Sequence, residues 1–594
     1  MKLIWKLWSL LVVIAILMGQ LLSVRPVSAQ DDGGTAVTPD PRFGAIESFW
    51  TPEEAAELGV GWDRILFYWN QIQPTGADDW NTLHVLEEWL HEANAQNRTV
   101  LGVLKNTPEW AWSPESEGSA AAVPAGLYLP INDPDNLWAA YTRKVAEYYA
   151  PLGVHHWIIW NEPDIAPDVY GHEFAGSMRD YYQLLKVAYK SIKAVDAEAT
   201  IHLGGMTYWH DPGYLRDFLN LVLEDPGAAE NDYYFDVITL HIYFRPESVP
   251  HIVGNAFNAQ VEAGINPPKE VWVNETNARP SMDPEWPVEV AWFPVDLEQQ
   301  AWYAVQATAL GFAAGASHVG IYKLVDVNIG SGEESWGLIR PHDFSKRPAF
   351  YAYQATIKYL SGFEFPVRRQ QFSDYFVVKF KKPDSAVRVL WARHEEAVTV
   401  KIPAMAETAV LADYLGNETV IEPEDGFYIL DLAGAVCYEE CFMGGAPLFL
   451  IEEGVGDERI PDAPASIGTP TITPTHSVLV TPTVSVISLP TEVPTATETA
   501  VPTDIPEPSP TATAAATPSP TATAAVTPSP TATMIPSFTP VVLAEAVTPE
   551  FDTSVSAAND DAPADRHQST YLIGALGLLG VVFVGAWWWR NGRS

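Results

Sequence analysis

Residues 157–164 have the sequence WIIWNEPD, in which an apolar run of strand type carries an Asn-Glu pair at its C-terminal end. Pro163 stops the strand there, because proline has no backbone N–H to donate. Residues 271–276, VWVNET, have the same pattern and bring Glu275 to the end of a second strand of buried type. The two segments predict a pair of carboxylates at strand ends, which acid–base and nucleophilic chemistry on a glycosidic bond requires.

The region from residue 41 to residue 360 alternates short apolar runs with amphipathic helical stretches, which is typical of a parallel sheet with crossover helices. Eight β/α units over this length predict an α/β fold, a (β/α)8 TIM barrel, whose active site lies at the C-terminal ends of the strands. Glu162 and Glu275 would both lie there, on strands four and seven. A doubly wound open sheet is the alternative, and the absence of a Gly-rich phosphate loop after an early strand disfavours it. The candidate strands are residues 43–46, 64–68, 99–104, 157–160, 200–203, 237–241, 271–273 and 318–324.

Residues 361–452 consist of short runs rich in β-branched and aromatic residues, separated by turn residues. They predict a small antiparallel β-sandwich that follows the barrel. The two cysteines of the chain, Cys437 and Cys441, lie in this region. Their short spacing suggests one small disulfide loop if the chain is exported, and two free thiols are the alternative.

The N-terminus predicts export. Residues 1–29 begin with Lys2 and Lys6, continue with an apolar centre and end with the small-residue sequence VSA. These are the three parts of a secretory signal peptide, and an uncleaved membrane anchor is the alternative.

The C-terminal part predicts a stalk and an anchor. Residues 453–568 are dominated by Pro, Thr, Ser and Ala, and they predict a disordered linker because they cannot build a core. Residues 571–589 carry no charge, are long enough to cross a bilayer as one helix, and are followed by Arg590 and Arg593. We therefore expect an extracellular domain anchored at the cell surface by a C-terminal transmembrane helix. A sorting signal that is later removed is the alternative.

The charge balance limits the partners. Lys and Arg number 34 against 75 Asp and Glu, a formal net charge of −41, which repels nucleic acid and anionic lipid. His155, His156 and His202 lie on or before different strands, without carboxylates at matching spacing. We therefore expect no metal and no cofactor.

The sequence Trp160-Asn161-Glu162-Pro163 on strand four, with a glutamate ending strand seven, resembles the retaining β-glycosidases of glycoside hydrolase clan A. The nearest likeness is to the β-xylosidase-type family 39 and the cellulase-like family 5, over residues 43–355. The resemblance implies Glu162 as the general acid/base and Glu275 as the nucleophile. It rests as well on Arg64 and on residues 69–74, 107–110 and 241–243.

Physical chemistry agrees with these two roles. The acid must hold a proton near neutral pH, which needs apolar or like-charged surroundings, whereas the nucleophile must stay ionised. Arg64 is the candidate cation beside Glu275, and Tyr243 is the candidate hydrogen-bond donor to the same carboxylate. Asn161 is placed to bind the sugar 2-hydroxyl.

Further substrate contacts are expected from His241, Trp110 and Trp336. Ordinary structural roles are the alternatives: a core histidine, packed indoles, an ion-paired arginine or a capping carboxylate. Many clan members end strand eight with a tryptophan that forms the floor of the sugar site. This chain has Ile-Tyr-Lys-Leu at residues 321–324, so Tyr322 or Trp336 would have to form that floor.

The sequence thus predicts a cell-surface retaining hydrolase of β-linked oligo- or polysaccharides. A non-catalytic carbohydrate-binding or adhesion protein on the same barrel is the alternative.

Overall fold

The computed structural model describes residues 39–466, apart from residues 117, 170, 289–292, 328–334, 439 and 456–458. The predicted signal peptide, the linker beyond residue 466 and the predicted helix at residues 571–589 therefore lie outside the described residues. Within the described part of the chain, no helix combines the length and the apolarity that a membrane span requires.

Eight parallel strands form a closed barrel in sequence order, and β1 closes it by pairing with β8 as well as β2. The prediction of an eight-stranded parallel barrel is confirmed. Strand eight ends at Ile321, earlier than predicted, and the Tyr322 carbonyl just beyond it accepts a hydrogen bond from the side-chain amide of Asn277. The strands are β1 (Asp40–Ala45), β2 (Val60–Tyr68), β3 (Thr99–Lys105), β4 (His156–Ile159), β5 (Thr200–Leu203), β6 (Val237–Tyr243), β7 (Glu270–Asn277) and β8 (His318–Ile321).

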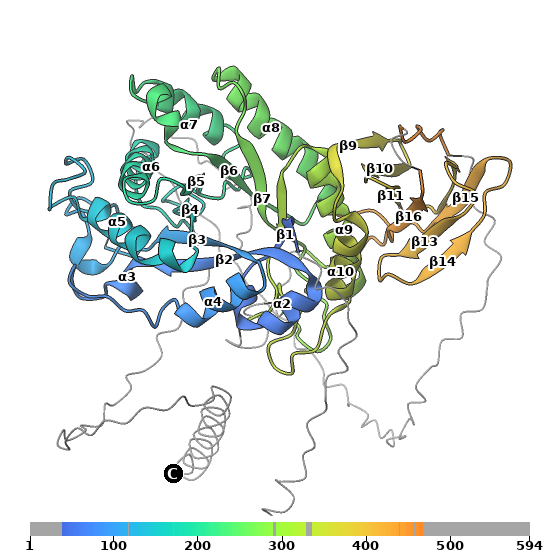
Figure 1. Ribbon diagram of the computed structural model, residues 1–594, viewed down its shortest axis with the longest axis horizontal. Coiled ribbons are helices and arrows are strands. Elements are labelled where there is room, and N and C mark those ends of the chain that lie inside the picture. Colours follow the sequence, from blue (N-terminus) through green and yellow to red (C-terminus); the bar gives the residue numbers. More distant parts are fainter. Residues whose placement is uncertain are drawn as a thin grey trace, which may run out of the picture. The chain divides into compact units, whose positions relative to one another are not determined.

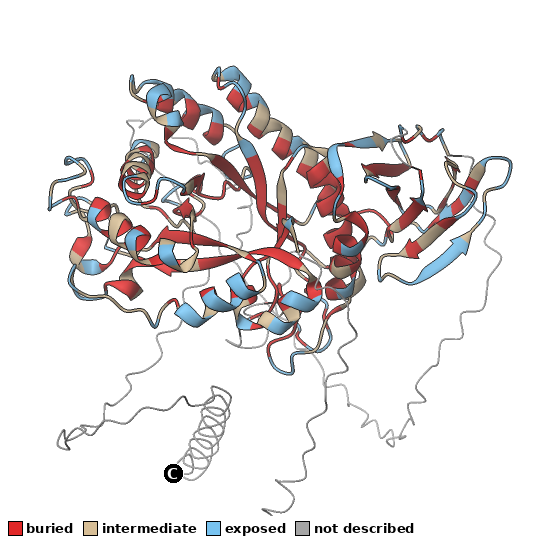
Figure 2. Ribbon diagram, viewed as in Figure 1, coloured by how far each residue is buried: buried red, intermediate tan, exposed pale blue. Residues whose placement is uncertain are grey.

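Helices lie around the outside of the barrel and turn their buried faces toward it (Figure 1; Figure 2). Two of the longer ones, α6 and α9, begin with capping boxes, formed by Ser177 with Asp180 and by Asp296 with Gln299. Such boxes satisfy backbone N–H groups that the first helical turn leaves unpaired. The helices are α2 (Pro52–Leu58), α3 (Trp69–Ile72), α4 (Glu87–Ala95), α5 (Leu137–Tyr149), α6 (Met178–Lys193), α7 (Tyr214–Leu223), α8 (Val249–Glu262), α9 (Leu297–Ala313) and α10 (Pro348–Leu360).

A tryptophan on β2 fills part of the barrel interior. Trp62 is fully buried, and its ring lies 5.8 Å from that of Trp272 on β7. A Cβ atom at Gly44 on β1 would lie 2.0 Å from this indole, and one at Gly320 on β8 would lie 2.3 Å from it. The two glycines are therefore needed for Trp62 to fit inside the closed sheet.

Two antiparallel sheets follow the barrel, as predicted. A six-stranded sheet has the order β14-β13-β16-β11-β10-β9, and β12 pairs with β15 in a second sheet. Side chains of β10 alternate: Val377 packs into the core between the sheets, whereas Phe380 packs toward the barrel helices, near Phe312 of α9. The strands are β9 (Glu364–Gln371), β10 (Tyr375–Lys381), β11 (Ser385–Ala392), β12 (Val398–Pro403), β13 (Ala409–Asp413), β14 (Glu418–Ile421), β15 (Phe427–Leu432) and β16 (Leu448–Glu453).

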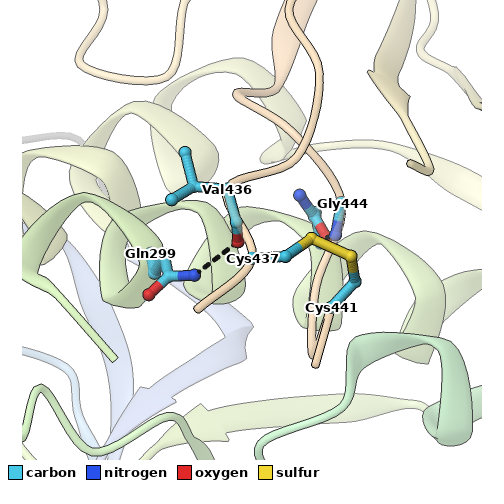
Figure 3. Close-up of a disulfide and its surroundings, with 6 residues drawn as sticks. Gln299, Val436, Cys437, Cys441 and Gly444 are labelled. Carbon is cyan, nitrogen blue, oxygen red and sulfur yellow. Dashed lines mark hydrogen bonds between the residues drawn. A yellow bond between two sulfur atoms is a disulfide. The ribbon is translucent and has the colours of Figure 1, made fainter. Parts of the chain in front are cut away.

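The connection between β15 and β16 carries a disulfide and lies against α9. Cys437 and Cys441 are bonded, which confirms the predicted loop (Figure 3). Just before it, the side-chain amide of Gln299 donates a hydrogen bond of 2.8 Å to the carbonyl of Val436. Gln306, two turns further along α9, accepts a hydrogen bond of 3.0 Å from the backbone N–H of Gly444. These bonds tie the β-domain to the barrel.

Candidate active site

Glu162 stands on a sharp turn directly after β4. Its backbone φ is +44°, and that of Trp160 is +68°. Left-handed conformations are uncommon for residues with a side chain, and they gather at functional sites. The turn is held in place by the Trp160 indole, which donates a hydrogen bond of 2.7 Å to the Glu173 carbonyl.

Glu275 lies on β7 itself, just after a bulge. Leu240 of β6 pairs with Val273, but the next residue, His241, pairs with Glu275, so that Asn274 is the extra residue. A bulge of this kind changes the direction in which the following side chains point. Here it brings Glu275 into register with His241 on the neighbouring strand.

The two glutamates meet at the mouth of the barrel. One oxygen of Glu162, one oxygen of Glu275 and a ring nitrogen of His241 all lie within 4.8 Å of one another. The Nδ1 atom of His241 lies 2.7 Å from Oε1 of Glu162 and 3.4 Å from Oε2 of Glu275. A gap of about 5 Å between catalytic carboxylates is typical of retaining glycosidases, and inverting ones have about 6.5–9.5 Å.

Glu275 is surrounded by groups that favour its ionised form. Its Oε1 forms an ion pair with the buried guanidinium of Arg64 on β2, and its Oε2 accepts a hydrogen bond from the Tyr243 hydroxyl on β6. Burial alone would raise the pKa of Glu275, but the charges of Arg64 and His241 and the Tyr243 hydrogen bond outweigh it. The pKa of Glu275 is therefore below its usual value, and this carboxylate is ionised at neutral pH.

Glu162 has the opposite environment. Burial raises its pKa to about 7, even though the contact with His241 opposes the rise. The negative charges of Glu173 and Glu275 add to the increase. Two neighbouring carboxylates with pKa values pushed apart in this way are suited to separate acid and nucleophile roles.

His241 is fixed in place by the backbone beneath it. A Cβ atom at position 205 would lie 1.9 Å from its Nε2, so Gly205 is required for the ring to lie there. Nε2 is buried and has no hydrogen-bond partner among the described residues, which leaves Nδ1 as the atom that serves the two glutamates. Burial would lower the pKa of His241, but Glu275 and then Glu162 raise it.

The other predicted residues divide into two groups. Asn161 is next to Glu162, and its Oδ1 is buried without a hydrogen-bond partner in the described part of the chain. The Tyr243 ring lies 5.0 Å from that of Trp336 and 6.2 Å from that of Tyr322, and the latter two rings are 6.1 Å apart. Trp110 instead donates its indole N–H to the Gln73 carbonyl, and no described contact joins it to either glutamate.

A buried ion-pair network holds Trp336. Asp326 accepts hydrogen bonds from the backbone N–H groups of Trp336 and Gly337, at 2.7 and 2.6 Å. Its second oxygen pairs with Arg347 at 2.8 Å, and Arg347 also pairs with Asp283 at 2.8 Å. The network fixes the indole against Tyr243.

The sequence interpretation missed a buried ion pair close to Glu162. Lys105, the last residue of β3, pairs with Glu173. A second missed pair joins Lys323 to Glu47 at the ends of β8 and β1. A lysine at or just beyond the end of a buried strand was a usable signal in both cases, but its partner follows only from the fold.

The same constellation is poorly suited to a metal. Glu162, His241 and Glu275 are close enough to surround a cation. However, the guanidinium of Arg64 already pairs with Glu275 and repels a second positive charge.

A scan against protein-family models found no match, and a search of the curated proteins found none either. Among solved structures, a family 39 glycoside hydrolase from the gut symbiont Bacteroides cellulosilyticus WH2 matches with a TM-score of 0.54 and 18% identity, covering 69% of this chain and 81% of that one. A GH30 endoxylanase from Clostridium papyrosolvens C71 matches with a TM-score of 0.48 and 14% identity, over 70% and 97% of the two chains. A monomeric β-xylosidase from Caulobacter crescentus CB15 matches with a TM-score of 0.46 and 13% identity, over 71% and 97%.

The barrel fold that the resemblance to glycoside hydrolase clan A implied is thus confirmed, and a family 39 glycoside hydrolase is one of the solved structures that share it.

Proposed function

We propose that this protein is a retaining β-glycosidase that hydrolyses O-glycosidic bonds by double displacement. The observation that carries the proposal is the pair Glu162 and Glu275, whose oxygens lie within 4.8 Å while their surroundings push the two pKa values in opposite directions. The likeness in fold to solved glycoside hydrolases supports the same class of reaction.

In the first step, an oxygen of Glu275 attacks the anomeric carbon, and the bond from that carbon to the leaving oxygen breaks. Glu162 gives its proton to the leaving oxygen, which departs as a neutral hydroxyl group. Arg64 and Tyr243 keep Glu275 ionised until it attacks. The product of this step is a covalent glycosyl ester on Glu275.

In the second step, Glu162 is a carboxylate and takes a proton from a water molecule. The oxygen of that water attacks the anomeric carbon, the ester bond to Glu275 breaks, and both glutamates return to their starting states. Asn161, whose Oδ1 is unpartnered, would hold the sugar 2-hydroxyl, a contact that strengthens in the transition state. No step requires a cofactor.

The test is hydrolysis of a panel of aryl β-glycosides and neutral polysaccharides by the purified residues 39–466. Glu275→Ala should lower kcat by at least about 10⁴-fold, because the step that forms the covalent intermediate is lost. Glu262→Ala, a change at an exposed glutamate at the end of α8, is the matched control, and its kcat should equal that of the wild type. Equal rates in wild type and Glu275→Ala would remove Glu275 from its role.

The same panel separates the alternative, a carbohydrate-binding protein without activity. That alternative predicts that the wild type binds polysaccharides but releases no reducing sugar from them.

We further propose that the domain acts outside the cell, held at the plasma membrane by the helix predicted at residues 571–589. The support is the sequence alone: the signal-peptide pattern, the Pro/Thr-rich linker and the uncharged C-terminal stretch. Protease added to intact cells should release the barrel and the β-domain as a soluble fragment. Protection from protease in intact cells would contradict this location.

A further inference from the structure

Exposed aromatic side chains of the barrel gather on one of its faces. Among the described residues 40–360, those that are aromatic and exposed are Trp50, Tyr128, Trp209, Phe344 and Tyr351. The first four lie on connections that run from the end of a strand to the next long helix, which is the face that carries the two glutamates. Tyr351 lies on α10 instead. An exposed aromatic ring on this face has an apolar surface that a ligand bound at the site can contact.

Two of these rings lie on opposite sides of the barrel mouth. Trp50 follows β1 and Trp209 follows β5, and in a closed barrel of eight strands these two strands face each other. A line from β1 to β5 has β4 with Glu162 on one side and β7 with Glu275 on the other. A chain that reached from Trp50 to Trp209 would therefore pass between the two carboxylates.

Each of the two indoles packs against neighbouring aromatic side chains and is about half exposed to solvent. Trp50 is 51% exposed, and its ring packs against those of Phe49, at 5.1 Å, and Trp89, at 5.4 Å. Trp209 is 57% exposed and packs edge-on against Tyr208, at 5.2 Å. The Tyr208 hydroxyl is in turn 2.7 Å from Nε2 of a histidine on α8. Each ring thus offers a flat apolar surface that the rest of the fold leaves uncovered.

We infer that the mouth binds a polysaccharide of several neutral β-linked pyranose units, with one part of the chain stacked on Trp50 and another on Trp209. The apolar face of a pyranose ring matches an indole face, and stacking removes both from water. The net charge of −41 disfavours a polyuronate. One part of the inference rests on the proposed function. If the glutamates cleave the polysaccharide, they cut it at an internal bond between Trp50 and Trp209, and the products are oligosaccharides.

The test uses Trp50→Ala and Trp209→Ala, with Tyr351→Ala as the matched control for loss of an exposed ring elsewhere. Binding is measured by retardation in native gels that contain xylan, mixed-linkage β-glucan or β-mannan, with Glu275→Ala as a background that leaves the polymer intact. Each tryptophan substitution should weaken retardation by one of these neutral polymers about tenfold. Trp50→Phe and Trp209→Phe should recover part of the affinity, since they keep a ring.

Kinetics give the second readout. On the polymer, KM should rise about tenfold in each tryptophan variant, whereas hydrolysis of a short aryl β-glycoside should be unchanged. Variants that behave like Tyr351→Ala, or retardation by polygalacturonate alone, would overturn the inference. Retardation that both tryptophan substitutions abolish supports it even if the wild type hydrolyses nothing, a result that would instead contradict the proposed function.

Discussion

The Nδ1 atom of His241 lies 2.7 Å from Oε1 of Glu162, so the candidate acid/base is held by a ring that is itself locked over Gly205. The same nitrogen faces Glu275 at 3.4 Å. The two carboxylates are therefore coupled through one histidine, and their proton affinities can be tested by the dependence of the rate on pH.

The alkaline limb of the pH–rate profile should follow the ionisation of Glu162. Its pKa is raised to about 7, and the general acid must be protonated to act, so kcat/KM should fall about tenfold per pH unit above pH 7. Glu162→Gln, which cannot lose a proton, should lose this limb together with most of the activity on poor leaving groups. A profile of Glu162→Gln that falls at the same pH as that of the wild type would contradict the assignment.

The acid limb should depend on Arg64. The guanidinium lowers the pKa of Glu275, so its removal in Arg64→Met should raise that pKa and move the acid limb to higher pH by about 1–3 units. Tyr243→Phe, which removes one hydrogen bond and no charge, should move it less. The measurement is kcat/KM from pH 3 to pH 8, with Arg64→Lys as the variant that keeps the charge. An acid limb at the same pH in Arg64→Met would contradict the pairing.

Three histidines at the N-terminal end of the barrel should make the fold sensitive to acid. Nδ1 of His156 lies 3.1 Å from Nε2 of His202, and the His318 ring stacks on Trp272 at 3.5 Å. Burial lowers the pKa of His156 and of His318 to about 4. In the unfolded chain, His156 and His318 take up their protons near pH 6.5, whereas in the folded chain they do so only near pH 4. Stability is therefore lost as the pH falls through this window, by about 3 kcal/mol at pH 4 for each of His156 and His318.

Guanidinium unfolding at pH 7.5, 5.5 and 4.5 measures this loss. His318→Gln should lose less stability than the wild type between pH 7.5 and pH 4.5, because it has one proton fewer to bind on unfolding. His91→Gln, at an exposed histidine on α4, is the control. The same acid-induced loss in His318→Gln and in His91→Gln would contradict the account.

The sequence was most informative where a pattern repeats along the chain. The barrel strands are short apolar runs before polar turns, so Glu162 and Glu275 could be assigned to one face of the barrel from the sequence alone. Tyr243 follows the predicted strand at residues 237–241 and could be expected on that face, whereas Arg64 begins its predicted strand and was expected there from the resemblance. The structure places both against Glu275.

Other features had no local signal. Lys105 and Glu173 are 68 residues apart and meet only through the fold. The edge strand β9 has no apolar alternation in its sequence, because its residues are mostly exposed and Val367 is its one buried side chain. The indole of Trp110 lies 5.8 Å from that of Trp69 and donates its N–H to the Gln73 carbonyl, contacts that its sequence position did not indicate. Its role as a substrate contact stays a prediction.

The most direct test of the central claim is to trap the glycosyl-enzyme. Residues 39–466 would be incubated with 2-deoxy-2-fluoro aryl β-glycosides of several sugars, digested, and sequenced by mass spectrometry. A 2-fluoro group slows both steps, and a good leaving group restores the first, so the covalent ester accumulates. The account predicts a single glycosylated residue, Glu275, and no label in Glu275→Ala. A label on Glu162, or turnover by Glu275→Ala at the wild-type rate, would contradict it.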